Sequence, residues 1–139
     1  GGSGRRFDLH HATTEILDIK SMTFSEGPTM ATQRYGAAAV KLADEERVLV
    51  IGGMDNNSAP LRSTEYLDLK TNTFSQGPQM RVARLYAAAV QIDERRVLVA
   101  GGDSDDAKKT TEVLDLSTGE FSLGPALLSN HTTALAVCV

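Results

Sequence analysis

The chain has 139 residues, about the length of one domain, and 41% of them are apolar while 23% are charged. This balance excludes an intrinsically disordered chain, and no stretch approaches the roughly 20 consecutive apolar residues that a membrane helix needs, so no membrane partner is predicted. The formal net charge of -4 argues against a nucleic-acid partner, which would favour a basic surface.

Three copies of one sequence pattern run along the chain. Each copy reads Thr-Glu-x-Leu-Asp, then Phe-Ser, then Gly-Pro, and the copies begin at Thr14, Thr64 and Thr111. A period of about 50 residues indicates that one supersecondary unit is used repeatedly. The sequence therefore predicts one repeat-built domain over 1–139, with repeats at about 1–35, 36–85 and 86–131 and the start of a further unit at 132–139.

The predicted elements of a full unit are four strands. In chain order, the Thr-Glu-x-Leu-Asp segment mixes apolar and acidic residues, as a half-buried strand does. The Phe-Ser segment is ended by a proline, which has no donor for a strand ladder. A small apolar strand follows, at 37–42, 87–92 and 134–139. The last is a continuous apolar run from Arg47 or Arg96 that stops at two glycines, which indicates a buried strand.

Short turns join the first two strands of each unit. Asn72 and Gly119 hold matching positions in two of these turns, and both residue types tolerate the left-handed backbone of a tight hairpin. Met22 holds that position in the first copy. The sequence therefore predicts a looser first hairpin.

A repeated four-stranded antiparallel unit of this length is a β-propeller blade. The alanine triplets of 37–39 and 87–89 suit the innermost strand, where side chains crowd around a central channel. The continuous apolar strand suits the second position, which neighbouring blades cover on both faces. The predicted fold is thus all-β, a partial propeller of about three four-stranded antiparallel blades.

Several residue types recur in register along these strands. They are Gly52, Gly53, Gly101, Gly102, Asp18, Asp68, Asp115, Phe24, Phe74, Phe121, Arg34 and Arg84. Their order resembles the kelch family, in which a Gly-Gly strand end, an Asp, an aromatic residue and an Arg recur in each blade. The resemblance implies a kelch-like β-propeller.

The chain departs from the kelch pattern at two kinds of position. Leu17, Leu67 and Leu114 stand where the family usually has an aromatic residue before the Asp. His131 stands where the repeat predicts an arginine, 47 residues after Arg84. The units are also similar to propellers related to galactose oxidase, but no residues match the copper site of those enzymes.

The predicted strands are too few for a closed ring. Propellers typically use about four to eight blades, and open blade edges expose unpaired backbone groups. Two explanations stay open. Either the chain is part of a longer protein, or copies of it self-associate so that two chains close the ring.

Three predicted loops differ between units, although the strands around them repeat. They follow the glycine pairs and read SGRRFDLHH, MDNNSAPLR and DSDDAKK. A constant scaffold with variable polar loops is typical of a binding surface. The candidate binding residues are Arg5, Arg6, Asn56, Asn57, Arg62, Asp103, Asp105 and Lys108. The alternative is that these loops are solvated turns.

Arg34 and Arg84 precede the small apolar strands in matching positions. One interpretation is a ring of cations near the mouth of the channel. The other is a structural ion pair between blades with the repeated glutamates Glu15, Glu65 and Glu112. The strict recurrence favours the ion pair, because scaffold residues repeat whereas ligand contacts usually differ between blades.

No catalytic or metal-binding set stands out in the sequence. Asp103, Asp105 and Asp106 lack the twelve-residue loop and terminal Glu of a common calcium site. The histidines match no ligand spacing, and Cys138, the single cysteine, excludes an intrachain disulfide and fits a reducing compartment such as the cytoplasm. The compartment itself stays undetermined, and no cofactor is predicted.

The resemblance and the lack of a catalytic set together favour a non-catalytic scaffold that binds a protein partner through the loops. The alternative is the propeller part of a larger kelch-like enzyme, galactose-oxidase-like or sugar-processing, with most catalytic residues outside this chain. Carbohydrate binding ranks last, because Phe7 is the only aromatic residue in the three loops.

Overall fold

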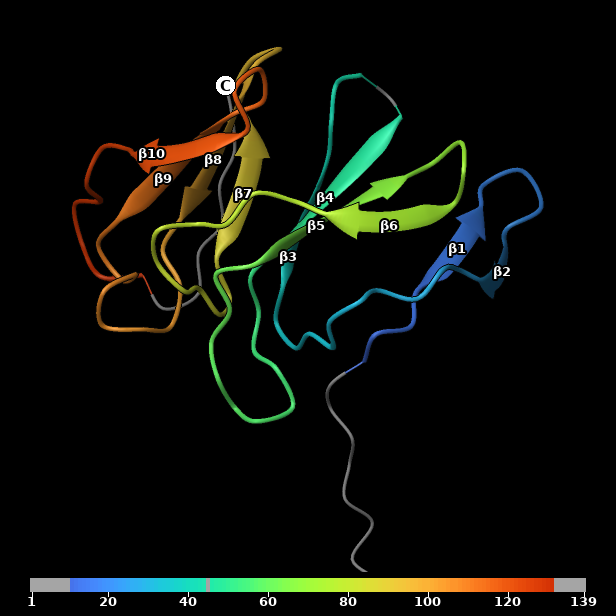
Figure 1. Cartoon of the computed structure of the whole chain (residues 1–139), viewed down its shortest axis with the longest axis horizontal. Helices are drawn as coiled ribbons and strands as arrows, with labels where there is room; N and C mark the ends of the chain where they lie inside the picture. Colours follow the sequence, from blue (N-terminus) through green and yellow to red (C-terminus); the bar gives the residue numbers. More distant parts are fainter. Residues whose placement is uncertain (1–10, 45, 132–139) are drawn as a thin grey trace, which may run out of the picture.

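The computed structural model describes residues 11–44 and 46–131. Within these residues there are ten strands in three antiparallel sheets and no helix (Figure 1). Arg5, Arg6, Cys138 and the small strand expected at 134–139 lie outside the described residues.

The three sheets follow one another along the chain. The first is a hairpin of β1 (Glu15–Asp18) and β2 (Thr23–Glu26), here called the first hairpin. The second, the middle blade, contains β3 (Ala38–Lys41), β4 (Arg47–Ile51), β5 (Thr64–Asp68) and β6 (Thr73–Gln76) in that spatial order. The third, the last blade, contains β7 (Ala88–Gln91), β8 (Arg96–Ala100), β9 (Thr111–Asp115) and β10 (Glu120–Leu123). The predicted four-stranded antiparallel blade is therefore confirmed twice.

The register repeats with the sequence. Leu17 pairs with Phe24, Leu67 with Phe74 and Leu114 with Phe121 in the three equivalent hairpins. Between the two blades, the strands that lie closest together are β3 and β7. These are the alanine-rich strands, so their small side chains permit the close approach that the innermost position of a propeller demands.

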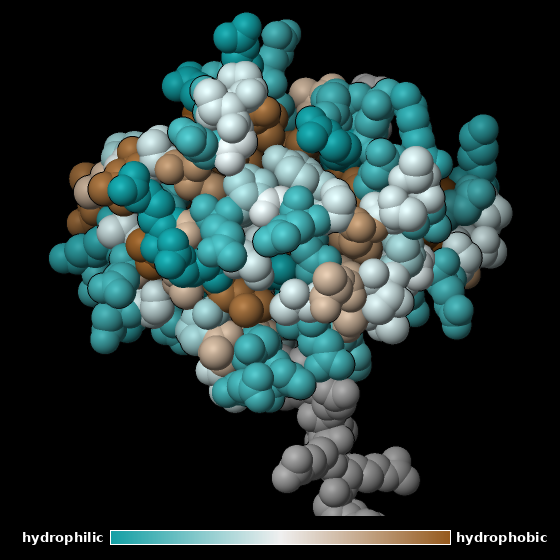
Figure 2. Space-filling model, in the orientation of Figure 1, coloured by the Kyte–Doolittle hydropathy of each residue, from teal (hydrophilic) through white to brown (hydrophobic). Residues whose placement is uncertain are grey.

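The core lies between the middle and last blades. Leu49 and Ile51 of β4 pack with Val97 and Val99 of β8, and all four are at most 1% exposed. Leu114 and Phe121 of the last blade, and Met80 of the connecting segment, complete this cluster. Burying one such side chain stabilises the fold by about 1.5–3 kcal/mol. The face seen in Figure 2 is instead covered largely by hydrophilic residues.

The glycine pairs bring the next connecting segment against the end of each buried strand. Gly53, with a φ of 92°, donates its N–H to the carbonyl of Arg84 at 2.8 Å. Gly102, with a φ of 124°, donates in the same way to the carbonyl of His131 at 3.0 Å. A Cβ on Gly52 would collide with the Arg84 carbonyl, so glycine is required by the close approach as well as by the backbone angle.

The looser first hairpin predicted from Met22 is wrong. Met22 has a φ of 56°, equal to that of Asn72 and close to the 72° of Gly119. The turn is held by Asp18, whose Oδ1 accepts the N–H groups of Lys20 at 2.8 Å and Ser21 at 3.1 Å. The Met22 N–H also donates to the Asp18 carbonyl at 2.7 Å. These bonds impose the left-handed conformation although methionine disfavours it.

Candidate functional site

Arg34 lies in the segment 27–37 that connects the first hairpin to the middle blade, and it is buried. Its Nη2 and Nε reach Oε1 of Glu65 at 3.1 and 3.2 Å, and its Nη1 donates to the carbonyls of Gly52 and Ser63 at 2.8 and 2.9 Å. Glu65 also accepts the backbone N–H groups of Ala31 at 2.8 Å and Thr32 at 3.1 Å. One carboxylate on β5 therefore fixes the whole connecting segment.

Arg84 repeats this arrangement in the segment 77–87, which leads into the last blade. Its Nε reaches Oε2 of Glu112 at 3.0 Å, and both side chains are 0% exposed. Glu112 accepts the N–H groups of Arg81 at 2.5 Å and Val82 at 3.3 Å. The structural ion pair is thus confirmed for Arg34 and Arg84, and the cation ring at a channel mouth is wrong because neither guanidinium is free to meet a ligand. The pair joins each connecting segment to the third strand of the blade that it enters.

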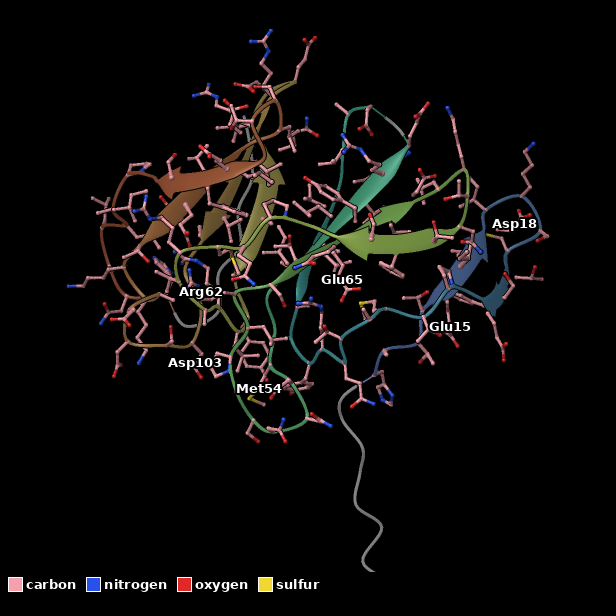
Figure 3. The ribbon with its side chains drawn as sticks, in the orientation of Figure 1. Glu15, Asp18, Met54, Arg62, Glu65 and Asp103 are labelled. Carbon is pink, nitrogen blue, oxygen red and sulfur yellow. The ribbon has the colours of Figure 1, made fainter. Side chains whose placement is uncertain are left out.

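The predicted binding loops emerge together on one side of the molecule. In Figure 1, the β4–β5 loop (residues 52–63) and the β8–β9 loop (residues 101–110) lie on the lower side of the view, opposite the β3–β4 and β7–β8 turns. Met54, Arg62 and Asp103, labelled in Figure 3, come from these two loops. We call the surface of residues 54–62 and 103–109, together with Tyr35 and Tyr86, the loop face.

Two tyrosines connect the loops across the loop face. The Tyr35 and Tyr86 rings meet edge to face, with centroids 5.6 Å apart and an interplanar angle of 76°. Tyr35 pairs with Met54 through two backbone hydrogen bonds of 2.9 Å, which ties the ring pair to the β4–β5 loop. The hydrogen bond to Tyr35, assisted by burial and by the nearby charge of Asp103, raises the pKa of Tyr86 above its usual value.

Tyr86 adopts a backbone conformation that is unfavourable for an aromatic residue. Its φ is 59°, and Gly36, at the matching position of the preceding unit, has a φ of 64°. The Tyr86 N–H donates to the Gly36 carbonyl at 2.9 Å. A left-handed residue that is not glycine is strained, and such strain concentrates at functional sites. Neither tyrosine was predicted from the sequence, although the exchange of Gly36 for Tyr86 at an offset of 50 was visible in the repeat.

The candidate residues of the β4–β5 loop divide into exposed and anchoring side chains. Asn56 and Asn57 are exposed at the tip of the loop. The loop closes on Asp55, whose Oδ1 accepts the N–H groups of Asn57 and Ala59, both at 2.9 Å. Arg62 is exposed, but its Nε donates to the Met80 carbonyl at 2.8 Å, so it also holds a connecting segment.

The candidate residues of the β8–β9 loop form an acidic surface with one ion pair. Asp103 and Asp105 are exposed, and Lys108 is partly covered. Lys108 Nζ lies 3.0 Å from Oδ1 of Asp105. This hydrogen bond and ion pair with Asp105 raise the pKa of Lys108. The structure therefore brings Asp105 and Lys108 together and leaves Asp103 beside Tyr86.

The described residues offer neither a metal-binding cluster nor a membrane-crossing helix. In residues 11–44 and 46–131, no group of three or more His, Cys, Asp and Glu side chains is arranged to hold a metal ion. The same part of the chain contains no helix of the length and apolarity that a membrane crossing requires.

Comparison with known proteins identifies the repeat. The family model described as the Kelch motif matches residues 34–81, which run from Arg34 through the whole middle blade to Arg81. None of the curated proteins compared with the chain matches it. The last blade has the same strand order, register and buried Arg–Glu pair as the middle blade that the motif covers. Residues 34–81 therefore carry a Kelch motif, and the all-β sheets are consistent with blades of a partial kelch propeller.

Proposed function

We propose that this chain is a non-catalytic scaffold that binds a protein partner through the loop face. The observation that carries the proposal is the pair of tyrosines set between two loops of unrelated sequence on an otherwise repeated framework. Tyrosine is enriched in protein interfaces because its ring offers a large apolar area and its hydroxyl a hydrogen bond.

The strain at Tyr86 supports the same conclusion. The repeat provides a less costly residue at this position, since Gly36 holds the same left-handed conformation in the preceding unit. Strained conformations persist where the surroundings impose them, and they cluster at binding and catalytic sites. A ring held at this cost between exposed polar loops fits a role as an anchor for a partner.

The charges of the loop face indicate how a partner would be oriented. The β8–β9 loop presents Asp103 and Asp105, whereas the tip of the β4–β5 loop presents the neutral amides of Asn56 and Asn57. A partner with a basic group near the acidic loop and hydrogen-bonding groups near the amide tip would complement this surface. Such complementary patches guide the approach and register of two proteins.

The test is comparative affinity capture from cell extract with three forms of the chain. The first is the wild type, and the second carries Tyr86→Gly, which removes the ring but leaves the backbone with the residue that the preceding unit uses. The third carries Glu94→Ala and Glu120→Ala, which change exposed residues outside the loop face. Quantitative mass spectrometry measures which proteins each form retains.

We expect to find a partner that the wild type and the third form retain in equal amounts. The Tyr86→Gly form should retain at least about fivefold less of this partner, because interface aromatic anchors typically contribute more than about 1 kcal/mol. Circular dichroism checks that all three forms are folded. If every captured protein is retained equally by Tyr86→Gly, the loop face is not the binding surface.

A further inference from the structure

Tyr66 of β5 shows how this chain holds a guanidinium at its surface. The Arg47 guanidinium lies over the Tyr66 ring, 5.0 Å from the ring centroid, and its Nε and Nη2 meet Oδ2 of Asp44 at 2.8 and 2.7 Å. The face of an aromatic ring attracts a cation and the carboxylate supplies the opposite charge, so the two groups bind one guanidinium together. The side chains of Arg47 and Asp44 are 41% and 36% exposed, so this arrangement forms without a buried pocket.

Tyr86 and Asp103 bring the same two kinds of group together on the loop face. The N–H of Asp103 donates to the carbonyl of Leu85 at 2.6 Å, which holds Asp103 beside the residue that precedes Tyr86. The raised pKa of Tyr86, which results first from the hydrogen bond to Tyr35 and from burial, also reflects the nearby charge of Asp103. Asp103 lies on the side of the molecule where Met54 also lies (Figure 3). An aromatic ring and a carboxylate are therefore neighbours here, as in the middle blade.

The ring of Tyr86 is held in place within the chain itself. It lies against Gly36, where an added Cβ would come within 2.7 Å of the ring carbon Cε1. Tyr35 meets the ring edge to face, with centroids 5.6 Å apart, and the Tyr86 N–H donates to the Gly36 carbonyl at 2.9 Å. The side chain is nonetheless partly exposed. A contact group that is already ordered loses little conformational freedom on binding, which favours affinity.

No described cation fills the corresponding place beside Tyr86. Lys108 lies within reach of the charge of Asp103, but its Nζ pairs with Oδ1 of Asp105 at 3.0 Å. The Nε of Arg62 donates to a backbone carbonyl of the connecting segment 77–87 at 2.8 Å. Among the residues that the structure describes, Asp103 forms no ion pair, and its side chain is exposed. The loop face thus has the ring and the carboxylate of the Arg47 arrangement without its guanidinium.

We propose that the loop face binds an arginine side chain of its protein partner, with the guanidinium against the Tyr86 ring and paired with the Asp103 carboxylate. This inference rests on the proposed function and adds the chemistry of the residue that the partner supplies. Arginine fits better than lysine, because its planar guanidinium stacks on a ring and pairs with a carboxylate through two N–H groups at once. The partner is thus a protein that presents an exposed arginine to this surface.

The probe is a phage-displayed library of random peptides, selected on the wild-type chain and counter-selected on Tyr86→Gly. Peptides that pass are synthesised with each arginine either kept or replaced by citrulline, which has nearly the same shape but no charge. Fluorescence polarisation then measures their dissociation constants for the wild type, Asp103→Asn and Glu94→Gln. Glu94→Gln removes one exposed carboxylate in the β7–β8 turn, outside the loop face, and is the control for net charge.

We expect the selected peptides to share an arginine. Replacing this arginine by citrulline, or Asp103 by asparagine, should each weaken binding at least about fivefold, as for a cation that meets both a ring and a carboxylate. Glu94→Gln should change the dissociation constant by less than about twofold. The citrulline and Asp103→Asn changes together should weaken binding little more than either alone, because two groups in contact are not additive in a double-mutant cycle.

Three outcomes would overturn the proposal. The first is a set of peptides that need Tyr86 but bind Asp103→Asn as tightly as the wild type, and the second is full additivity of the citrulline and Asp103→Asn effects. In both cases the loop face remains a binding surface and only the arginine contact is wrong. The third is a selection that yields no peptide dependent on Tyr86.

The result is separable from the test of the proposed function. Arginine-dependent peptides, combined with affinity capture that finds no partner dependent on Tyr86, would support the arginine contact and contradict the protein-binding function. Circular dichroism verifies that Asp103→Asn, Tyr86→Gly and Glu94→Gln are folded.

Discussion

Arg84 and Glu112 are charged residues that are fully buried, and their surroundings explain how the fold tolerates them. The guanidinium meets one carboxylate and the carbonyls of Gly101 and Thr110, at 2.7 and 3.1 Å, and the carboxylate meets two backbone N–H groups. A buried ion pair contributes little net stability, because desolvation offsets much of the attraction, but the loss of one partner leaves a buried charge unpaired. The pair therefore acts mainly to specify where the connecting segment lies.

We predict that Arg84→Met lowers the free energy of unfolding by about 3–5 kcal/mol, because Glu112 would remain buried without its partner. Arg96→Ala breaks an exposed ion pair with Asp93 and should cost about 1 kcal/mol or less. Urea denaturation followed by circular dichroism measures both values. Similar losses for the two variants would contradict the view that burial makes the Arg84 pair critical.

The hairpins that join the Thr-Glu-x-Leu-Asp strand to the Phe-Ser strand of each unit are held by the same kind of hydrogen bond. Asp18, Asp68 and Asp115 each accept two backbone N–H groups from the turn that follows. In the middle blade, the N–H groups of Thr71 and Lys70 stabilise the carboxylate and lower the pKa of Asp68 below its usual value. The aspartate of the kelch pattern is therefore a turn residue in this chain, and it fixes the left-handed residue of the hairpin even where that residue is Met22.

The lowered pKa of Asp68 predicts a pH-dependent difference between the wild type and Asp68→Asn. The charged carboxylate stabilises the folded state above the pKa that Asp68 has when unfolded, and this stabilisation is lost as the pH falls through the lower folded pKa. Wild type should therefore be more stable than Asp68→Asn at neutral pH. The difference in urea midpoint should shrink steadily towards strongly acidic pH, and a difference that stays constant over this range would contradict the prediction.

The stacking of blades decides which of the repeated residues are buried. Leu17 and Leu114 occupy the same position in the repeat, yet Leu114 lies in the core against the middle blade and Leu17 lies on the open face of the first hairpin. Phe24 and Phe121 differ in the same way, at 67% and 8% exposed. The contribution of a residue to the stability of this chain thus depends on whether a neighbouring blade covers it, and not on its place in the motif.

This difference gives a matched pair of substitutions. Leu114→Ala should lower the free energy of unfolding by about 2–5 kcal/mol, as expected for a cavity in a packed core. Leu17→Ala should cost under about 1 kcal/mol, because this side chain is exposed. Both are measured by urea denaturation followed by circular dichroism. Equal losses would contradict the view that the cover of a neighbouring blade sets the contribution of these leucines.

The repeat allowed most of the fold to be predicted from the sequence. Strand type, strand order, the Gly-Gly strand ends and the Arg–Glu pairing follow from local patterns, which report how the chain alternates between buried and exposed positions. The looser hairpin at Met22 was predicted wrongly, because residue preference favoured one conformation and the hydrogen bonds of Asp18 imposed another. The binding roles of Asn56, Asp103 and the other loop residues stay predictions.

Other features depended on contacts between segments distant in the sequence. The meeting of Tyr35 with Tyr86, the anchoring of Arg62 on Met80 and the opposite environments of Glu15 and Glu112 are of this kind. The periodicity of the sequence indicates on which face of its own strand a residue lies. Only the packed structure decides which neighbour meets it, because that depends on how whole blades stack.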